Sequence, residues 1–194
     1  MLLDASLRRI PVKQEHILTF MSKIFNNNHA ELAPPLKDHE ECWYLSLFGV
    51  YHPKKPDQIR GVFDSSAKCN EVSLNSVLLT GPNLTNDLLG MLIRFGKEMV
   101  AVTADIQHMF HCFLEREDHC NYLQFLWHKD NDIENDLIEH RMRVHVFGNS
   151  PSPAIATLGL RRTAQASGKD YGNQVTQLVS RNVSVDDGLT SSIS

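Results

Sequence analysis

The sequence has no long hydrophobic run, no Cys-x-x-Cys pair and no excess of positive charge. No apolar stretch approaches the roughly 20 residues that a helix needs to cross a bilayer, which excludes a helical membrane protein. Near the start of the chain, Asp4, Arg8 and Arg9 interrupt the apolar residues, which excludes a signal peptide. We therefore expect an intracellular, cytoplasmic protein that has no membrane partner.

The chain has only four cysteines, and an intracellular protein keeps its cysteines reduced. A group of histidines and cysteines lies in the middle of the sequence and comprises His108, His111, Cys112, His119 and Cys120. Such a group could indicate zinc, but structural zinc sites usually contain closely spaced cysteine pairs. Because no such pair is present, we interpret the group as buried cysteines and surface histidines.

Positive charge is scarce, since 19 lysines and arginines face 23 aspartates and glutamates and give a formal net charge of −4. Proteins that bind nucleic acid normally carry a basic surface that contacts phosphate. Charge alone therefore argues against nucleic acid as a partner. A site that holds metal ions is acidic, however, because its ligands are carboxylates. Basic contacts to a duplex can also lie in segments that this chain lacks.

Hydrophobic residues make up 42% of the chain and charged residues 22%, as in a globular protein of one domain or two small subdomains. Apolar periodicity predicts helices over residues 12–25 and 87–95, from about Pro153 onward, and in a segment ending near Ser180. Aromatic and β-branched runs predict strands over residues 43–51, 59–64, 99–105, 122–127 and 138–146, and on both sides of Asp186-Asp187. This mixed order, with antiparallel hairpins, predicts the α+β class.

Three segments carry specific expectations about burial. The run 99–105 is apolar up to its final aspartate, which predicts a strand that is covered on both faces. In the helix over 87–95, capped by Thr85 or Asn86, the expected buried residues are Leu88, Leu89, Leu92 and Phe95. The strand over 138–146 alternates, with Met142, Val144 and Val146 on one face and Arg141, Arg143 and His145 on the other.

Three aspartates are candidates for metal-dependent chemistry. Asp105 ends the apolar strand, and Asp186-Asp187 lies in a predicted tight hairpin. Phosphoryl transfer by two divalent cations needs carboxylates from different strands at one point, and magnesium prefers such oxygen ligands. Taken alone, Asp186-Asp187-Gly188 is more simply a hairpin turn, and Asp105 a cap for the following segment.

The order of motifs along the chain resembles the reverse transcriptase domain of BEL/Pao-type LTR retrotransposon polyproteins. The resemblance runs from Trp43 to Ser191 and rests on residues 48–56 (FGVYHPKKP), 62–67 (VFDSSA), 73–75 (SLN), 77–82 (VLLTGP), 103–105 (TAD), 144–154 (VHVFGNSPSPA), 159–162 (GLRR) and 185–191 (VDDGLTS). It implies a right-hand polymerase fold with fingers and a partial palm, built on an antiparallel sheet with flanking helices. Residues 1–41 resemble the helical lead-in of these domains, and residues 42–194 the fingers and palm.

The resemblance implies an RNA-directed DNA polymerase that adds deoxynucleotides to a primer 3′-hydroxyl on an RNA or DNA template. Asp105, Asp186 and Asp187 are then the catalytic residues, and with the backbone of Ile106 they would hold two Mg²⁺ ions, for which Mn²⁺ can substitute. The implied substrate-binding residues are Arg60 at the triphosphate, Phe110 as the ring that excludes a 2′-hydroxyl, and Phe147-Gly148 under the templating pair. Lys54 or Lys55 is either a second phosphate contact or part of a solvated turn.

Several positions depart from the family pattern. Ser184 and Val183 replace aromatic residues before Val-Asp-Asp, which is expected to loosen primer placement, and Gly61 replaces a β-branched residue of the fingers strand. The thumb and RNase H parts of the parent polyprotein are expected outside this chain. The resemblance adds virus-like particles of the parent element as an alternative location within the cell. The rival hypotheses are an inactive relic that binds nucleic acid or protein, and an α+β binding module in which Asp186-Asp187 is only a turn.

Overall fold

The computed structural model describes residues 2–193, which divide into two compact units. The first unit contains the chain up to Leu78 together with Leu114–Asn149, and the second contains Leu79–Phe113 and the chain from Ser150 onward. Among residues 2–193, no helix combines the length and the apolar character that crossing a membrane requires. The predicted boundary between residues 41 and 42 separates the helical lead-in from the fingers and palm. This functional division stays a prediction.

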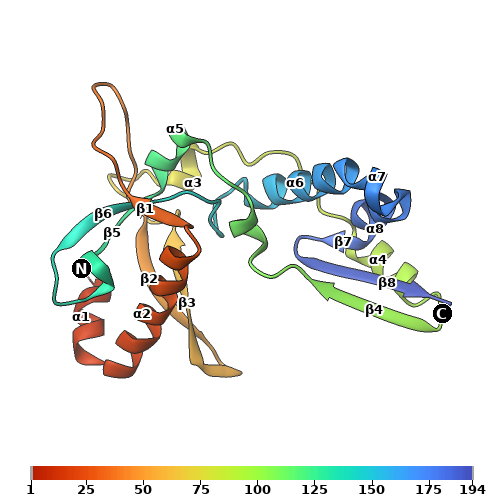
Figure 1. Cartoon of the computed structure of the whole chain (residues 1–194), viewed down its shortest axis with the longest axis horizontal. Coiled ribbons are helices and arrows are strands. Elements are labelled where there is room, and N and C mark those ends of the chain that lie inside the picture. The colour runs from red at the N-terminus through yellow and green to blue at the C-terminus, as the bar shows by residue number, and fades with distance from the viewer. Residues whose placement is uncertain (1, 194) are drawn as a thin grey trace. The chain divides into compact units, whose positions relative to one another are not determined.

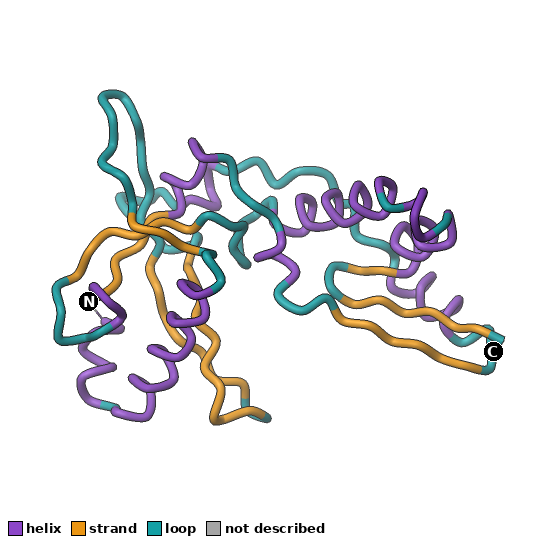
Figure 2. The backbone as a smooth tube through the Cα atoms, in the orientation of Figure 1, coloured by secondary structure: helices purple, strands orange, loops and turns teal. Residues whose placement is uncertain are grey.

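The first unit is built from short helices and two small sheets (Figures 1 and 2). Its α-helices are α1 (Leu2–Arg9), α2 (Pro11–Asn26), α3 (Leu74–Val77) and α5 (Glu117–Cys120). Its strands are β1 (Ala30–Leu32), β2 (Ser46–His52), β3 (Lys55–Asp64), β5 (Gln124–His128) and β6 (Leu137–Met142). Short 3-10 turns η2 (Asn121–Leu123) and η3 (Lys129–Asn131) flank β5.

A three-stranded antiparallel sheet in the order β1-β6-β5 supports the core of this unit. Ile17 and Met21 on α2 are fully buried, as are Phe125 on β5 and Met142 on β6. The predicted helix over 12–25 is therefore confirmed, because its apolar stripe packs into this core.

The β2–β3 hairpin forms the second sheet of this unit, and Figure 1 shows α2 running along it. Gly49 on β2 pairs directly with Gly61 on β3. A Cβ atom at Gly61 would clash with the ring of Phe20 on α2, and one at Gly49 would clash with Ile59 and approach Ile17. The two glycines thus let α2 lie close to the hairpin, which gives Gly61 a packing role that the sequence did not reveal.

The strand predicted over 138–146 is regular only to Met142, and the expectation for its polar face is wrong at two residues. Met142, Val144 and Val146 are buried as predicted, but Arg141 and His145 are buried as well. Arg141 donates hydrogen bonds to Glu31 and Glu117, and His145 contacts Glu115. A strand face can bury charge when each charged group has such a partner.

The second unit contains a three-stranded antiparallel sheet in the order β4-β8-β7, with helices beside it (Figure 1). Its strands are β4 (Val100–Asp105), β7 (Val183–Ser184) and β8 (Asp187–Ser192). Its helices are α4 (Leu88–Phe95), the 3-10 turn η1 (Met109–Cys112), α6 (Ser152–Ala166), α7 (Gly168–Tyr171) and α8 (Asn173–Asn182).

Two burial predictions in this unit are wrong. Every residue of β4 is exposed, because β4 is an edge strand whose one neighbour among residues 2–193 is β8. On α4, Met91 is buried, whereas Leu88, Leu89 and Leu92 are exposed. The helix cap is Asp87, whose side chain accepts a hydrogen bond from the backbone N–H of Gly90, rather than Thr85 or Asn86.

Candidate active site

The register of the second sheet brings the three predicted aspartates to one end. Asp105, the last residue of β4, pairs with Asp187, the first residue of β8. The backbone N–H of Ile106 then donates a hydrogen bond of 2.9 Å to the carbonyl oxygen of Asp186. Two segments far apart in the sequence therefore meet through backbone contacts at the predicted acidic site.

The turn between β7 and β8 has an unusual backbone. Val185 and Asp186 form its two central residues, and Val185 has a φ of 56°. A two-residue hairpin turn with positive φ at its first central position normally has glycine there, and a β-branched residue in this region is a true outlier. Such strain is held in place by surrounding structure, and it is common at functional sites.

The chemistry of this end of the sheet fits a hard cation. Asp105 and Asp187 are exposed and Asp186 is half-buried, and none of the three forms an ion pair with another residue in the range 2–193. Carboxylate oxygens are ligands that Mg²⁺ prefers. Within the described residues, however, no three His, Cys, Asp or Glu side chains converge as metal ligands. The backbone brings the donors together, but their side chains do not form a closed metal site.

The same finding bears on the zinc alternative, because His108, His111 and Cys112 also form no ligand group of three among residues 2–193. The rings of His108 and His111 stack in parallel with centroids 5.9 Å apart. Phe110 lies between them in sequence, on η1 just after β4, and is half-buried. Phe110 and Ile106 thus belong to the same unit as the aspartates.

Arg60 lies in the first unit, on the exposed face of the β2–β3 hairpin. It pairs directly with Val50, and the neighbouring pair on this face is Phe48 and Val62. Phe48 and Val50 are exposed, as is Arg60. The hairpin therefore presents an aromatic and aliphatic face with a cation, opposite the face that α2 covers. Phe48 was not predicted as a site residue, although the alternation along β2 indicates that it faces away from α2.

Phe147 and Gly148 form an exposed corner of the first unit. Gly148 has a φ of 101°, a conformation that glycine adopts without strain, and a Cβ there would meet nothing within 4 Å. The side-chain amide of Asn75 donates a hydrogen bond of 2.9 Å to the carbonyl oxygen of Gly148.

A second pair of side chains fixes the same corner, because Ser65 donates a hydrogen bond to the side chain of Asn149 and both residues are buried. Asn75, Ser65 and Asn149 were not predicted as positioning residues. All three residues lie inside motifs that carry the family resemblance, at 73–75 (SLN), 62–67 (VFDSSA) and 144–154 (VHVFGNSPSPA), and these positions could have indicated their importance.

The predicted site residues are thus divided between the units. Asp105, Ile106, Phe110, Asp186 and Asp187 lie in the second unit, whereas Arg60, Phe147 and Gly148 lie in the first.

Comparison with known proteins gives fold similarity alone. No family model matches the sequence, and no curated protein matches it. Among solved structures, the foamy viral protease-reverse transcriptase dRH in complex with double-stranded DNA matches 93% of the chain with a TM-score of 0.63 and 17% sequence identity. The foamy viral protease-reverse transcriptase in complex with double-stranded DNA matches 92% of it with a TM-score of 0.62 and 16% identity.

This chain spans 26% and 31% of the length of those two chains. At such low identity the likeness establishes architecture and leaves activity to be argued from the site. The protein therefore has a mixed α and β fold of the reverse transcriptase type.

Proposed function

We propose that this chain is the fingers and partial palm of an RNA-directed DNA polymerase, of the BEL/Pao retrotransposon type that its motifs resemble. Its reaction would be the template-directed addition of deoxynucleotides to a primer 3′-hydroxyl. The observation that carries the proposal is the pairing of Asp105 with Asp187, next to Asp186, in a fold of the reverse transcriptase type.

In this proposal Asp105, Asp186 and the backbone carbonyl of Ile106 would hold the metal ions, with Asp187 as a weaker ligand. Magnesium, when bound, supplies charge neutralisation for the transferring phosphoryl group and its leaving oxygen. The exposure of Asp105 and Asp187 leaves their oxygens accessible to ions from solvent. The strained turn at Val185 would fix the direction in which the backbone presents Asp186.

The proposal assigns substrate contacts to further residues. Arg60 would bind the triphosphate, since a guanidinium matches phosphate oxygens with a pair of donors. Phe110 would exclude a ribose 2′-hydroxyl by steric contact. Phe147 and Gly148 would lie under the templating pair, and Phe48 would offer a ring face to the template, as aromatic side chains do for unpaired bases. The proposed partners are an RNA or DNA template-primer and deoxynucleotides.

Two observations favour a rival function. The three aspartates do not form a closed ligand group within the described residues, and Ser184 stands where an aromatic residue is expected. A protein that has kept the fold but lost catalysis would look the same, and it would act at most as a module that binds nucleic acid or protein.

Primer extension on an RNA template with magnesium separates the two functions. The chain is assayed alone and fused to the thumb of a reverse transcriptase, each beside its Asp186→Asn variant. Asp118→Asn, which changes an exposed aspartate on α5 in the first unit, is the matched control. Extension that the control retains and Asp186→Asn abolishes supports the polymerase. If neither form extends the primer while both retain binding to the template-primer, the inactive module is the better account.

A further inference from the structure

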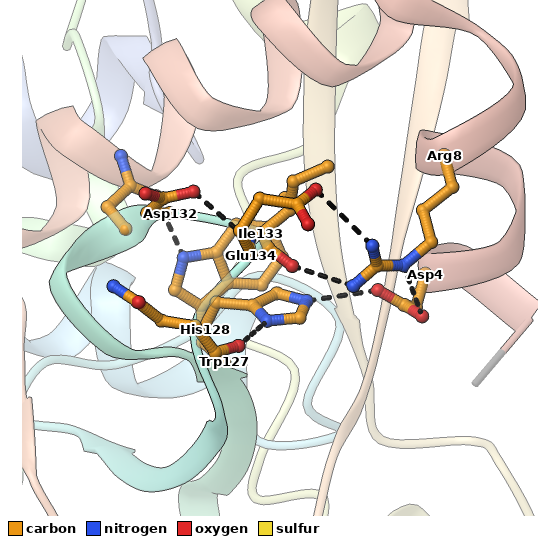
Figure 3. A network of polar contacts seen from close by, with 9 residues as sticks. Asp4, Arg8, Trp127, His128, Asp132, Ile133 and Glu134 are labelled. Atoms are coloured by element: carbon orange, nitrogen blue, oxygen red, sulfur yellow. Dashed lines mark hydrogen bonds and ion pairs between the residues drawn. The ribbon is translucent and has the colours of Figure 1, made fainter.

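His128, the last residue of β5, connects helix α1 to the turn that follows β5 (Figure 3). Its Nδ1 lies 2.7 Å from the carbonyl oxygen of Asn135, and its Nε2 lies 3.0 Å from Oδ1 of Asp4 on α1. The imidazole is buried, with only 4% of the residue exposed. Both ring nitrogens are therefore engaged inside the protein rather than by bulk water.

The chemistry of these two contacts fixes the number of ring protons. A backbone carbonyl can only accept a hydrogen bond, so Nδ1 must carry a proton. An ionised carboxylate also only accepts, so Nε2 must carry a second proton. Burial alone would raise the pKa of Asp4, but the hydrogen bond from His128 and the charge of Arg8 outweigh it, and the pKa is lowered. Asp4 is thus ionised, and His128 satisfies both acceptors only as the imidazolium.

We propose that His128 is a proton-dependent latch that holds α1 against the β5 turn. In the imidazolium form it donates to Asp4 and Asn135 together. When the ring loses a proton, one nitrogen faces an oxygen acceptor with a lone pair, and that contact becomes repulsive. Whichever nitrogen keeps its proton, the ring loses the positive charge that attracts the Asp4 carboxylate, so the hold on α1 weakens.

The latch acts beside contacts that do not depend on this proton. Arg8 donates a hydrogen bond of 2.7 Å to the carbonyl oxygen of Ile133 and pairs with Glu134 at 3.3 Å. Leu7 is buried in the core. Deprotonation of His128 therefore raises the frequency with which α1 opens and does not release it completely.

Other charged groups near the ring come from each neighbouring element. On α1 they are Asp4 and Arg8, and on η3 and the turn they are Lys129, Asp130, Asp132 and Glu134. A cavity of about 460 Å³ adjoins the site, and from β6 it is lined by His140, whose pKa is lowered by burial. From α2 the cavity receives the uncharged side chains of Ser22 and Asn26. His128 is the imidazole among these groups that contacts a carboxylate.

The direction of the pH dependence follows from the two partners. The latch is complete where Asp4 is ionised and His128 is protonated. When the ring loses a proton as pH rises, the contribution of His128 is lost. At strongly acidic pH the contribution of Asp4 is lost as its lowered pKa is crossed. Docking of α1 is therefore strongest where both groups are charged.

Hydrogen exchange of the α1 amides, corrected for the intrinsic pH dependence of exchange, tests the latch in the intact chain. Between about pH 5.5 and about pH 8, the opening equilibrium of α1 is expected to rise about tenfold, the size of one lost hydrogen bond to a charged group. Asp4→Asn is expected to flatten this dependence, because an amide can either donate to or accept from Nε2. Asp118→Asn, on exposed α5, is the matched control and should behave like the parent chain.

A direct measurement of the ring protons keeps the test independent of how the variants fold. At about pH 6, nitrogen NMR of the parent chain should show both nitrogens of His128 protonated, with exposed His119 as the internal reference. A neutral His128 ring at that pH, or an α1 opening equilibrium that changes with pH equally in the parent chain and in Asp4→Asn, would overturn the proposal.

Discussion

At the residue scale, Val185 occupies a backbone conformation that β-branched side chains rarely adopt. Replacing it by glycine removes this strain, so Val185→Gly is expected to raise the free energy of unfolding by about 1 kcal/mol. Chemical denaturation measures the change. Val183→Gly is the matched control, because it removes a buried side chain two residues away and should lower the free energy of unfolding. A destabilised Val185→Gly variant would show that the turn is not strained.

Tyr44 and Glu139 form another local pair whose behaviour depends on pH. The phenol donates a hydrogen bond of 2.7 Å to the Glu139 carboxylate, and this contact, with burial and the carboxylate charge, raises the pKa of Tyr44. The stabilisation is present below the usual tyrosine pKa of about 10 and is lost as pH rises through the higher folded value.

Glu139→Gln is therefore expected to lower the pKa of Tyr44 toward about 10, because the phenolate no longer faces a negative charge. The measurement is NMR titration of the tyrosine rings. Glu71→Gln, an exposed glutamate paired with Lys68, should leave the titration of Tyr44 unchanged. If Glu139→Gln also leaves it unchanged, the hydrogen bond does not control the phenol.

At the element scale, the contact between α2 and the β2–β3 hairpin depends on the opposed glycines Gly49 and Gly61. Gly61→Val would place its side chain against the Phe20 ring, and overpacking of this kind costs about 1–3 kcal/mol of unfolding free energy. Thermal or chemical unfolding measures the loss. Combining Gly61→Val with Phe20→Ala should recover part of it, whereas losses that simply add would contradict the proposed contact.

Local sequence patterns predicted several helices and strands, but they did not predict which of these elements are buried. Helix α2 and the β7–β8 hairpin follow from apolar spacing and turn residues, which act over a few positions. An apolar sequence such as that of β4 occurs both in central strands and in edge strands, so the exposure of β4 could not be predicted. Burial of Arg141 depends on Glu31 and Glu117, which are distant in sequence.

The candidate site could likewise be predicted only in part from the sequence. The motif order predicted that Asp105 approaches Asp186-Asp187, and the register of β4 and β8 pairs the backbone of Asp105 with that of Asp187. That their carboxylates share a metal ion stays a prediction. The hydrogen bond from Asn75 to the carbonyl oxygen of Gly148 could not be predicted, since it joins loops that carry no periodicity.

At the scale of the whole molecule, the proposed function assigns the triphosphate of the incoming nucleotide to Arg60. In an extended chain that carries a thumb, Arg60→Ala is expected to raise the KM for deoxynucleotides by about tenfold or more, the usual size of a lost charged hydrogen bond. Arg60→Lys should recover part of this loss, because lysine keeps the charge without the paired donors.

Steady-state primer extension separates KM from kcat, and Asp186→Asn should instead abolish kcat. An unchanged KM in Arg60→Ala would remove Arg60 from the proposed substrate contacts.

The most direct test of the account is the position of a bound divalent ion in the present chain. Mn²⁺, added during an NMR titration, is expected to broaden the backbone signals on both sides of Asp105 and of Asp186 together. Asp105→Asn should abolish this broadening at both segments, and Asp118→Asn should leave it intact. Broadening at only one of the two segments, or at both segments in Asp105→Asn, would contradict a shared metal site.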